Sequence, residues 1–152
     1  MIRLSLFSCP LLLIIICIYK FGENMDLKNK RKSNEYFHVY ILCSNSNNRF
    51  VKVGKANNLK RVPYFNEAGY AGVTDWVQVL SLISDSNHSA LSLEAMISSR
   101  LNNLGYAHPK IFWNDLKVEG RRVGATECYN CHVDQVIDIA VEMADVYYKY
   151  IA

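Results

Sequence analysis

The sequence predicts a single α/β domain in which a small three-stranded sheet is flanked by helices. Two segments rich in β-branched and aromatic residues are joined by a polar turn, and a third such segment follows. Helical periodicity occurs in the segments between and after these strands. The chain has 152 residues, of which 51% are hydrophobic, and this is enough for one packed core.

The first two strands are predicted at residues 36–42 and 50–54, and they are expected to form a β-hairpin. Residues 44–48 between them read SNSNN, which are residue types that favour turns. The third strand is predicted at residues 76–83, WVQVLSLI, because this segment is rich in β-branched and apolar residues.

Three helices are predicted, at residues 57–66, 88–104 and 133–150. The apolar residues expected on one side of the second helix are Ala90, Leu91, Leu93, Ile97, Leu101 and Leu104. Residues 69–72 and 105–124 are expected to be loops, because they contain most of the chain's glycines and Pro109. Within the second loop, Phe112 and Trp113 either stack on a base or pack into the core, and the core role is the expectation.

Glu94 falls inside the expected apolar face of the second helix. An ionised carboxylate in such a place costs several kcal/mol unless it has a partner. The partner is either a metal ion or a cationic side chain, Arg61 or Lys52. The residues alone leave both alternatives open.

The second strand ends in Gly54 and runs directly into a basic segment. Gly54 lets the backbone approach a ligand closely, and Lys55 adds a mobile charge. Lys60 and Arg61 lie near the start of the predicted helix, where an anion is favoured. We therefore expect this segment to bind a phosphate backbone.

These segments resemble the GIY-YIG nuclease superfamily. Residues 38–40, HVY, stand where that family has its first signature, and residues 52–54, KVG, stand where it has the second. Lysine in place of the second tyrosine makes the chain most similar to the bacteriophage-type, DNA-binding branch. Residues 124–129 resemble the short strand that closes that domain, which implies a fourth strand. The resemblance covers residues 36–148.

The resemblance implies a metal-dependent endonuclease that hydrolyses phosphodiesters of DNA. Glu94 would hold one divalent ion, Mg²⁺ or Mn²⁺, and Tyr40 would orient or deprotonate the attacking water. Lys52 would assist where other members use a tyrosine. Lys55 and Arg61 would neutralise charge on the phosphoryl oxygens.

Other residues would support DNA binding. Gly54, Lys60, Arg121 and Arg122 are the further candidates for contacts with the phosphate backbone. Glu127 is either a second functional acid or an exposed residue at a strand end. A binding module that retains the phosphate contacts without turnover is the alternative function.

The net charge is +3, and the distribution of the charge is more informative than its sum. Residues 25–35 form a basic arm that contains Lys28, Lys30, Arg31 and Lys32. Together with the basic segment after Gly54, the arm favours a polyanionic partner such as DNA. A solvated basic linker is the alternative interpretation of the arm.

Residues 1–24 form an apolar leader, in which residues 4–19 are nearly continuously apolar. This run is shorter than the roughly 20 residues of a typical transmembrane helix. It predicts a membrane contact or anchor, unless translation begins at Met25. If the run is inserted in a membrane, the basic residues after it would keep the domain in the cytoplasm. No signal-peptide cleavage site follows the run, which argues against export.

Residues 128–132, CYNCH, match the haem attachment pattern of c-type cytochromes through Cys128, Cys131 and His132. We expect no haem, because few residues follow the motif and the charge distribution keeps the domain inside the cell. A zinc site would need further ligands from Cys43, His38, His108 or His132. Reduced structural thiols are the simplest interpretation.

Overall fold

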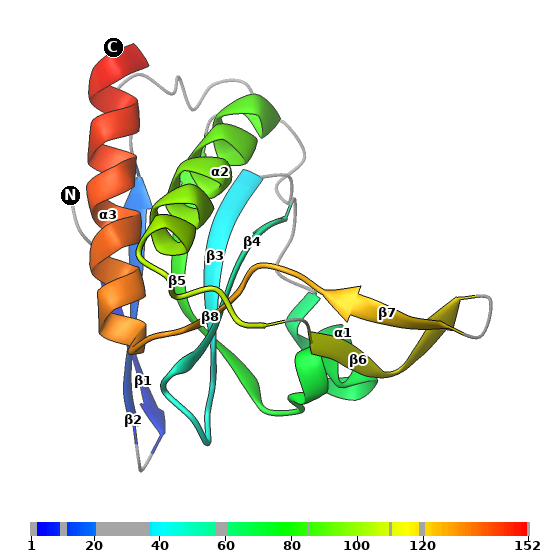
Figure 1. The fold of residues 1–152 in the computed structure, drawn as a ribbon. Coiled ribbons are helices and arrows are strands. Elements are labelled where there is room, and N and C mark those ends of the chain that lie inside the picture. The colour runs from blue at the N-terminus through cyan, green and yellow to red at the C-terminus, as the bar shows by residue number, and fades with distance from the viewer. Residues whose placement is uncertain are drawn as a thin grey trace.

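The computed structural model describes residues 3–9, 12–20, 37–56, 61–84, 86–109, 111–118 and 121–151 (Figure 1). The elements in chain order are β1 (Arg3–Cys9), β2 (Leu12–Lys20), β3 (Phe37–Ser44), β4 (Phe50–Ala56), α1 (Arg61–Ala68), the 3-10 turn η1 (Tyr70–Gly72), β5 (Trp76–Ser84), α2 (Asn87–Asn103), β6 (Ile111–Val118), β7 (Arg121–Ala125), β8 (Cys128–Asn130) and α3 (Val133–Ile151). The predicted basic arm at residues 25–35 lies outside the described residues.

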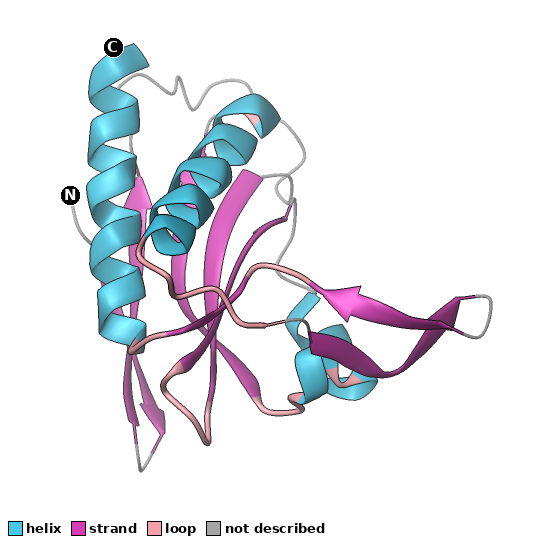
Figure 2. Cartoon of the chain, in the orientation of Figure 1, coloured by secondary structure: helices cyan, strands magenta, loops and turns pink. Residues whose placement is uncertain are grey.

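The central sheet has four antiparallel strands in the order β5-β3-β4-β8. The predicted α/β class is confirmed, and the sheet has the fourth strand in addition to the three expected from β-rich composition. At the β5 edge, β2 pairs in parallel and β1 pairs with β2 in the antiparallel sense. Strands β6 and β7 form a separate two-stranded sheet (Figure 2).

The predicted β3–β4 hairpin is confirmed, and its side chains alternate between the two faces of the sheet. Val39 and Val53 face one buried cluster, whereas Tyr40 and Leu42 face the other. The polar turn is held by Asp75, whose carboxylate accepts hydrogen bonds from the Ser44 hydroxyl and the Ser46 amide, both at 2.8 Å. The turn therefore fixes the register that places Tyr40 opposite Gly54.

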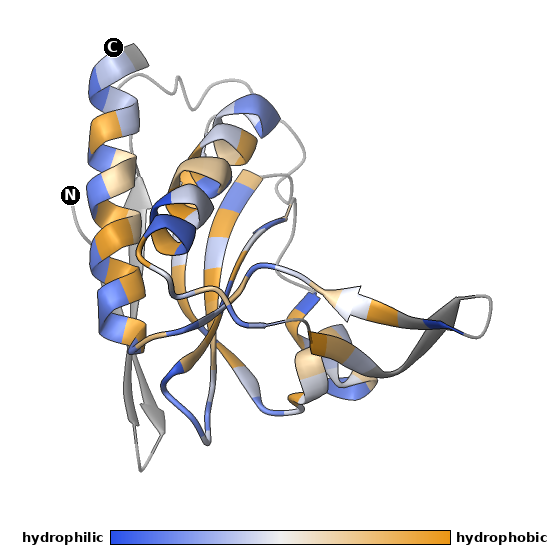
Figure 3. Cartoon of the chain, viewed as in Figure 1, coloured by the Kyte–Doolittle hydropathy of each residue, from blue (hydrophilic) through white to orange (hydrophobic). Residues whose placement is uncertain are grey.

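Helices α2 and α3 lie side by side over one face of the sheet (Figure 1). The side chains between them and the sheet form the helix cluster, which includes Val39, Ile41, Val51, Val53, Leu93, Ile97, Leu101, Val136, Ala140 and Ala144. The helix over residues 133–150 is confirmed, with one further residue, and its hydrophobic residues recur along the helix (Figure 3).

The expected apolar face of α2 is wrong at two positions. Leu91 and Leu104 are 46% and 42% exposed. Leu91 is turned about 100° from Ala90, which is buried, so it lies beside the stripe that contacts the sheet. Leu104 follows the last residue of the helix, Asn103.

The opposite face of the sheet carries the aromatic cluster, which comprises Tyr40, Leu42, Ala56, Phe65, Tyr70, Ala71, Trp76, Trp113 and Cys128. Burial of Trp113 is confirmed. The loop predicted at residues 105–124 is wrong, because most of this segment forms the β6–β7 hairpin, which projects from the sheet (Figure 1). Trp113 packs edge-on against Tyr70, and this contact fixes the base of the hairpin.

The described part of helix α1 runs from Arg61 to Ala68, and residues 57–60 of the predicted helix lie outside the described residues. Lys60 lies outside the described residues. In the N-terminal leader, β1 and β2 extend the sheet, and no helix of the described chain is both long and apolar enough to cross a bilayer.

Candidate phosphate-binding site

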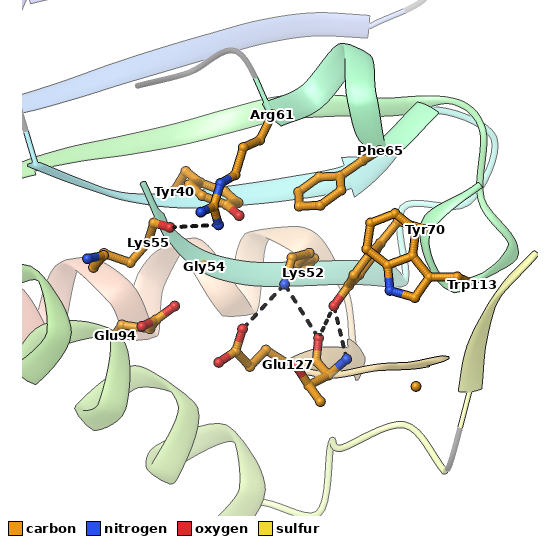
Figure 4. A pocket seen from close by; sticks show the side chains of 12 residues that line it. Tyr40, Lys52, Gly54, Lys55, Arg61, Phe65, Tyr70, Glu94, Trp113 and Glu127 are labelled. Carbon is orange, nitrogen blue, oxygen red and sulfur yellow. Dashed lines mark hydrogen bonds and ion pairs between the residues drawn. The ribbon is translucent and has the colours of Figure 1, made fainter. Parts of the chain in front are cut away.

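A cavity of about 290 Å³ lies at the edge of β4, where β8 pairs with Phe50, Val51 and Lys52 and the strand then continues past it. Elements far apart in the sequence contribute its walls (Figure 4). The lining residues are Tyr40, Lys52, Gly54, Lys55, Arg61, Phe65, Tyr70, Glu94, Trp113, Gly124, Thr126 and Glu127. The structure therefore brings together six residues that the sequence predicted for the site, namely Tyr40, Lys52, Gly54, Lys55, Arg61 and Glu94.

Lys52 is the buried cation of the cavity, with 4% of its surface exposed. Its Nζ lies 3.3 Å from the Glu127 carboxylate and 4.6 Å from the centre of the Tyr70 ring. Burial alone would lower the pKa of Lys52, but the nearby oxygens of Tyr70, Tyr40 and Glu127 raise it above its ordinary value. Lys52 is therefore a fixed positive charge in the floor of the cavity.

Glu127 lies in the turn before β8 and has φ 59°, a left-handed conformation that costs a non-glycine residue roughly 1–3 kcal/mol. Two contacts hold this turn. The Val53 amide donates to the Glu127 carbonyl at 3.1 Å. The Tyr70 hydroxyl donates to the Thr126 carbonyl at 2.6 Å and accepts from the Thr126 amide at 2.9 Å. The strained turn thus points the Glu127 carboxylate toward Lys52 (Figure 4).

Tyr70 is a site residue that the sequence analysis missed, because it assigned residues 69–72 to a loop. Tyr70 is buried, belongs to the aromatic cluster and also lines the cavity. Its partner Thr126 is 56 positions away in the sequence, so no local pattern could reveal the contact.

Glu94 enters the cavity from α2 and is half-buried. Burial raises the pKa of Glu94, and the charge of Glu127 raises it further. Lys52 and Lys55, including the Lys55 backbone amide, act in the opposite direction on this pKa. The sequence proposed Arg61 or Lys52 as the cationic partner of Glu94. Lys52 forms its ion pair with Glu127 instead.

Tyr40 and Gly54 are cross-strand partners, and the Tyr40 ring lies directly over Gly54. A Cβ atom on Gly54 would overlap the hydroxyl end of this ring. Burial raises the pKa of Tyr40, and the charges of Lys52 and Arg61 oppose the shift. The phenol is therefore neutral near pH 7 and can donate a hydrogen bond into the cavity.

Two further cations stand at the rim of the cavity. Arg61 donates to the Lys55 carbonyl at 3.4 Å, and the Lys55 ammonium donates to the side chain of Asn87, the first residue of α2. Arg121 is exposed on β7 and does not line the cavity. The side chain of Arg122 lies outside the described part of the chain.

A divalent metal ion would suit the two carboxylates of the cavity. The negative charges of Glu94 and Glu127 repel each other, and this repulsion contributes to the raised pKa of Glu94. A cation between the two carboxylates would relieve the repulsion. Mg²⁺ prefers oxygen ligands and is commonly held by one or two carboxylates together with water and substrate phosphate. Within the described ranges, no group of three or more His, Cys, Asp or Glu side chains could hold a metal ion.

The cysteines of the CYNCH motif lie in different parts of the core. Cys128 belongs to the aromatic cluster and Cys131 to the helix cluster. Burial raises the pKa of Cys128 to about 11, so this thiol is protonated at neutral pH. Cys43 is likewise buried.

The site combines three cations, two carboxylates and a neutral phenol around one cavity, a set that suits a phosphate diester better than an uncharged ligand. Comparison of the chain with family models, with curated proteins and with solved structures finds no match.

Proposed function

We propose that this protein binds DNA and hydrolyses its phosphodiester linkages in the β4-edge cavity, as a metal-dependent endonuclease of the GIY-YIG type. The observation that carries the proposal is the convergence of Lys52, Tyr40 and Glu94 on one cavity. These residues come from β4, β3 and α2, and each of them is predicted from the sequence as a site residue.

The cations select an anionic substrate. Lys52 is charged and cannot move away, because its ammonium group is held by the Glu127 carboxylate and by two backbone carbonyls. Lys55 and Arg61 add mobile charges at the rim. A phosphate group that enters the cavity therefore meets positive charge on several sides, which favours the extra charge of a pentacoordinate phosphorus.

Glu94, with Glu127 on the facing wall, would hold the divalent ion, Mg²⁺ or Mn²⁺. When bound, such an ion supplies Lewis acidity that polarises the phosphoryl group and stabilises the leaving oxygen. The Tyr40 phenol orients the attacking water by a hydrogen bond, and Arg61 binds a non-bridging phosphoryl oxygen. Lys52 fixes Glu127 and adds charge where a second phenol would stand in related nucleases.

A plasmid-nicking assay tests the proposal. We expect the wild-type protein to convert supercoiled plasmid to the open circular form when Mg²⁺ or Mn²⁺ is present. Glu94→Ala should abolish nicking while it leaves DNA binding intact, because Arg61 and the lysines remain. Glu142→Ala is the matched control, since Glu142 is an exposed acid on α3 outside the cavity, and it should nick like the wild type.

A DNA-binding module without turnover is the second candidate. The observation that favours it is the Lys52–Glu127 ion pair, which occupies one of the two carboxylates of the cavity. DNA binding without nicking in the wild type would select this function. Failure of the wild type to bind DNA would refute both.

We propose a cytoplasmic location for the domain, which the basic residues after the apolar leader favour. A membrane contact through residues 4–19 remains a prediction, and it would keep the nuclease domain on the cytoplasmic side if translation begins at Met1.

A further inference from the structure

A second cavity, of about 420 Å³, borders the first one. Thr126 and Glu127 line both cavities, so the turn before β8 forms their shared wall. Helix α2 runs past both of them and contributes Glu94 to the first and Ser98 and Asn102 to the second. Because these three residues are four positions apart, they lie in one stripe and advance about 6 Å at each step.

The two cavities differ in charge. Lys52, Lys55 and Arg61 line the first, whereas no lysine or arginine is found among the described residues that line the second. Apart from the Glu127 carboxylate of the shared turn, the walls of the second cavity are neutral polar groups and apolar side chains, which include Ala107 and Ile111. A phosphate therefore belongs in the first cavity, and an uncharged group with both polar edges and apolar faces belongs in the second.

His108 lines the second cavity, and one of its ring nitrogens is a buried polar atom without a partner among the described residues. Its ring stacks on Phe50 with centroids 4.3 Å apart, which fixes the plane of the imidazole. Nε2 is buried and has no hydrogen-bond partner within the described chain. Burial lowers the pKa of His108, so the ring is neutral and can hydrogen-bond an uncharged ligand. Buried polar atoms are rarely left without partners, and a ligand would supply one.

We propose that the second cavity binds the nucleoside next to the phosphate held in the first cavity, with its base withdrawn from the stack. The inference rests on the proposed function of the first cavity and adds the form of the substrate. The advance of about 6 Å between successive residues of this α2 stripe is comparable to the length of one nucleotide in an extended strand. A base inside a duplex cannot enter such a pocket, so the substrate is a single strand or a locally unpaired nucleotide.

The test compares two tetramers with equal numbers of phosphates. One is tetrathymidylate, and the other has an abasic tetrahydrofuran unit at every position. Binding to the full chain is measured by calorimetry in EDTA, so that cleavage does not interfere. We expect tetrathymidylate to bind at least about tenfold more tightly, since contacts to a single base commonly contribute that much.

Variants locate the effect. Asn102→Ala removes a polar group from the second cavity, and Ala107→Leu fills part of its volume, so both should reduce the affinity ratio toward one. Asn103→Ala is the matched control. Asn103 is exposed like its neighbour Asn102 but lines neither cavity, so this variant should keep the wild-type affinity ratio. Asn102 is exposed, so its variant should fold even if Ala107→Leu does not.

The outcomes separate this inference from the proposed function. Equal binding of both tetramers by the wild type would overturn the nucleoside pocket and leave the phosphate site intact. Absence of binding by either tetramer would overturn both. A ratio that survives in Asn102→Ala and Ala107→Leu would place the base elsewhere and also refute the inference.

Discussion

Lys52 organises the charges of the cavity, because it is buried, positively charged and paired with Glu127. Its ammonium group lies over the Tyr70 ring, so the cation is held by an aromatic ring as well as by oxygen atoms. Tyr40 stands beside it, over Gly54. These side chains are packed closely, so small changes at single positions should have measurable consequences.

Gly54→Ala should destabilise the protein and reduce nicking. The added Cβ overlaps the Tyr40 ring and must displace it from its present position, and overpacking of this kind costs about 1–3 kcal/mol. Chemical denaturation measures the free energy of unfolding. Gly124→Ala is the control for stability, because its Cβ would meet only the Ile111 carbonyl, at 3.9 Å, and its cost should stay within about 0.5 kcal/mol. Equal costs for the two variants would contradict the packing argument.

The nicking rate should fall on the acid side at a pH above 4.5, the ordinary pKa of a glutamate, because the pKa of Glu94 is raised and only its ionised form would hold a metal ion. Glu127→Gln removes a like charge, so the pKa of Glu94 should fall and the acid limb should move to lower pH. Rates measured as a function of pH at one fixed, subsaturating Mg²⁺ concentration give the position of the limb independently of its height. Glu142→Gln should leave the limb in place, and an unmoved limb in Glu127→Gln would refute this coupling.

Helix α2 has one face that packs in the core and a border that reaches the cavity. Leu93, Ile97 and Leu101 anchor it in the helix cluster, and Glu94 lies at the border of that face. The Ser86 hydroxyl accepts a hydrogen bond from the Ser89 amide at 3.0 Å and caps the start of the helix. The packing of α2 on the sheet therefore sets the position of the Glu94 carboxylate.

Leu93→Ala should lower the free energy of unfolding by about 2–5 kcal/mol, because Leu93 is fully buried and its truncation leaves a cavity. Leu91→Ala makes the same chemical change on the same helix at a position that is 46% exposed, and it should cost less than about 1 kcal/mol. Urea unfolding curves compare the two. Similar losses would contradict the orientation of α2.

Local patterns predicted the elements unevenly. The β3–β4 hairpin and α3 were predicted well, because alternation with period two and helical periodicity are local signals. The β6–β7 hairpin was predicted as a loop, since its glycines and Pro109 resemble turn chemistry. Among the described strands, β6 and β7 pair only with each other, and Trp113 packs them against Tyr70.

The molecule as a whole is a four-stranded antiparallel sheet with the helix cluster on one face and the aromatic cluster on the other. The candidate site lies where β4 continues beyond β8, between α1 and α2. The described elements that form this site all lie within residues 37–151.

A chain that begins at Met25 should therefore fold and should bind DNA like the full chain. Both clusters and the cavity are built from described residues that follow Phe37. Loss of β2 uncovers the edge of β5, so a lower midpoint of thermal unfolding is expected. Circular dichroism during heating measures this midpoint, with the full chain as the reference. A shortened chain without a cooperative transition would show that the leader is required for folding.

The chain's local chemistry was sufficient to indicate the hairpin, the helices and the residue types of a phosphate site, because these depend on neighbours a few positions apart. The arrangement around Lys52 depends on the folded chain. Its partner Glu127 is 75 positions away, and the Tyr70 hydroxyl holds Thr126 across 56 positions. Such contacts form only when β8 pairs with β4 and a strained turn orients Glu127, which is a property of the packed sheet and of no single segment.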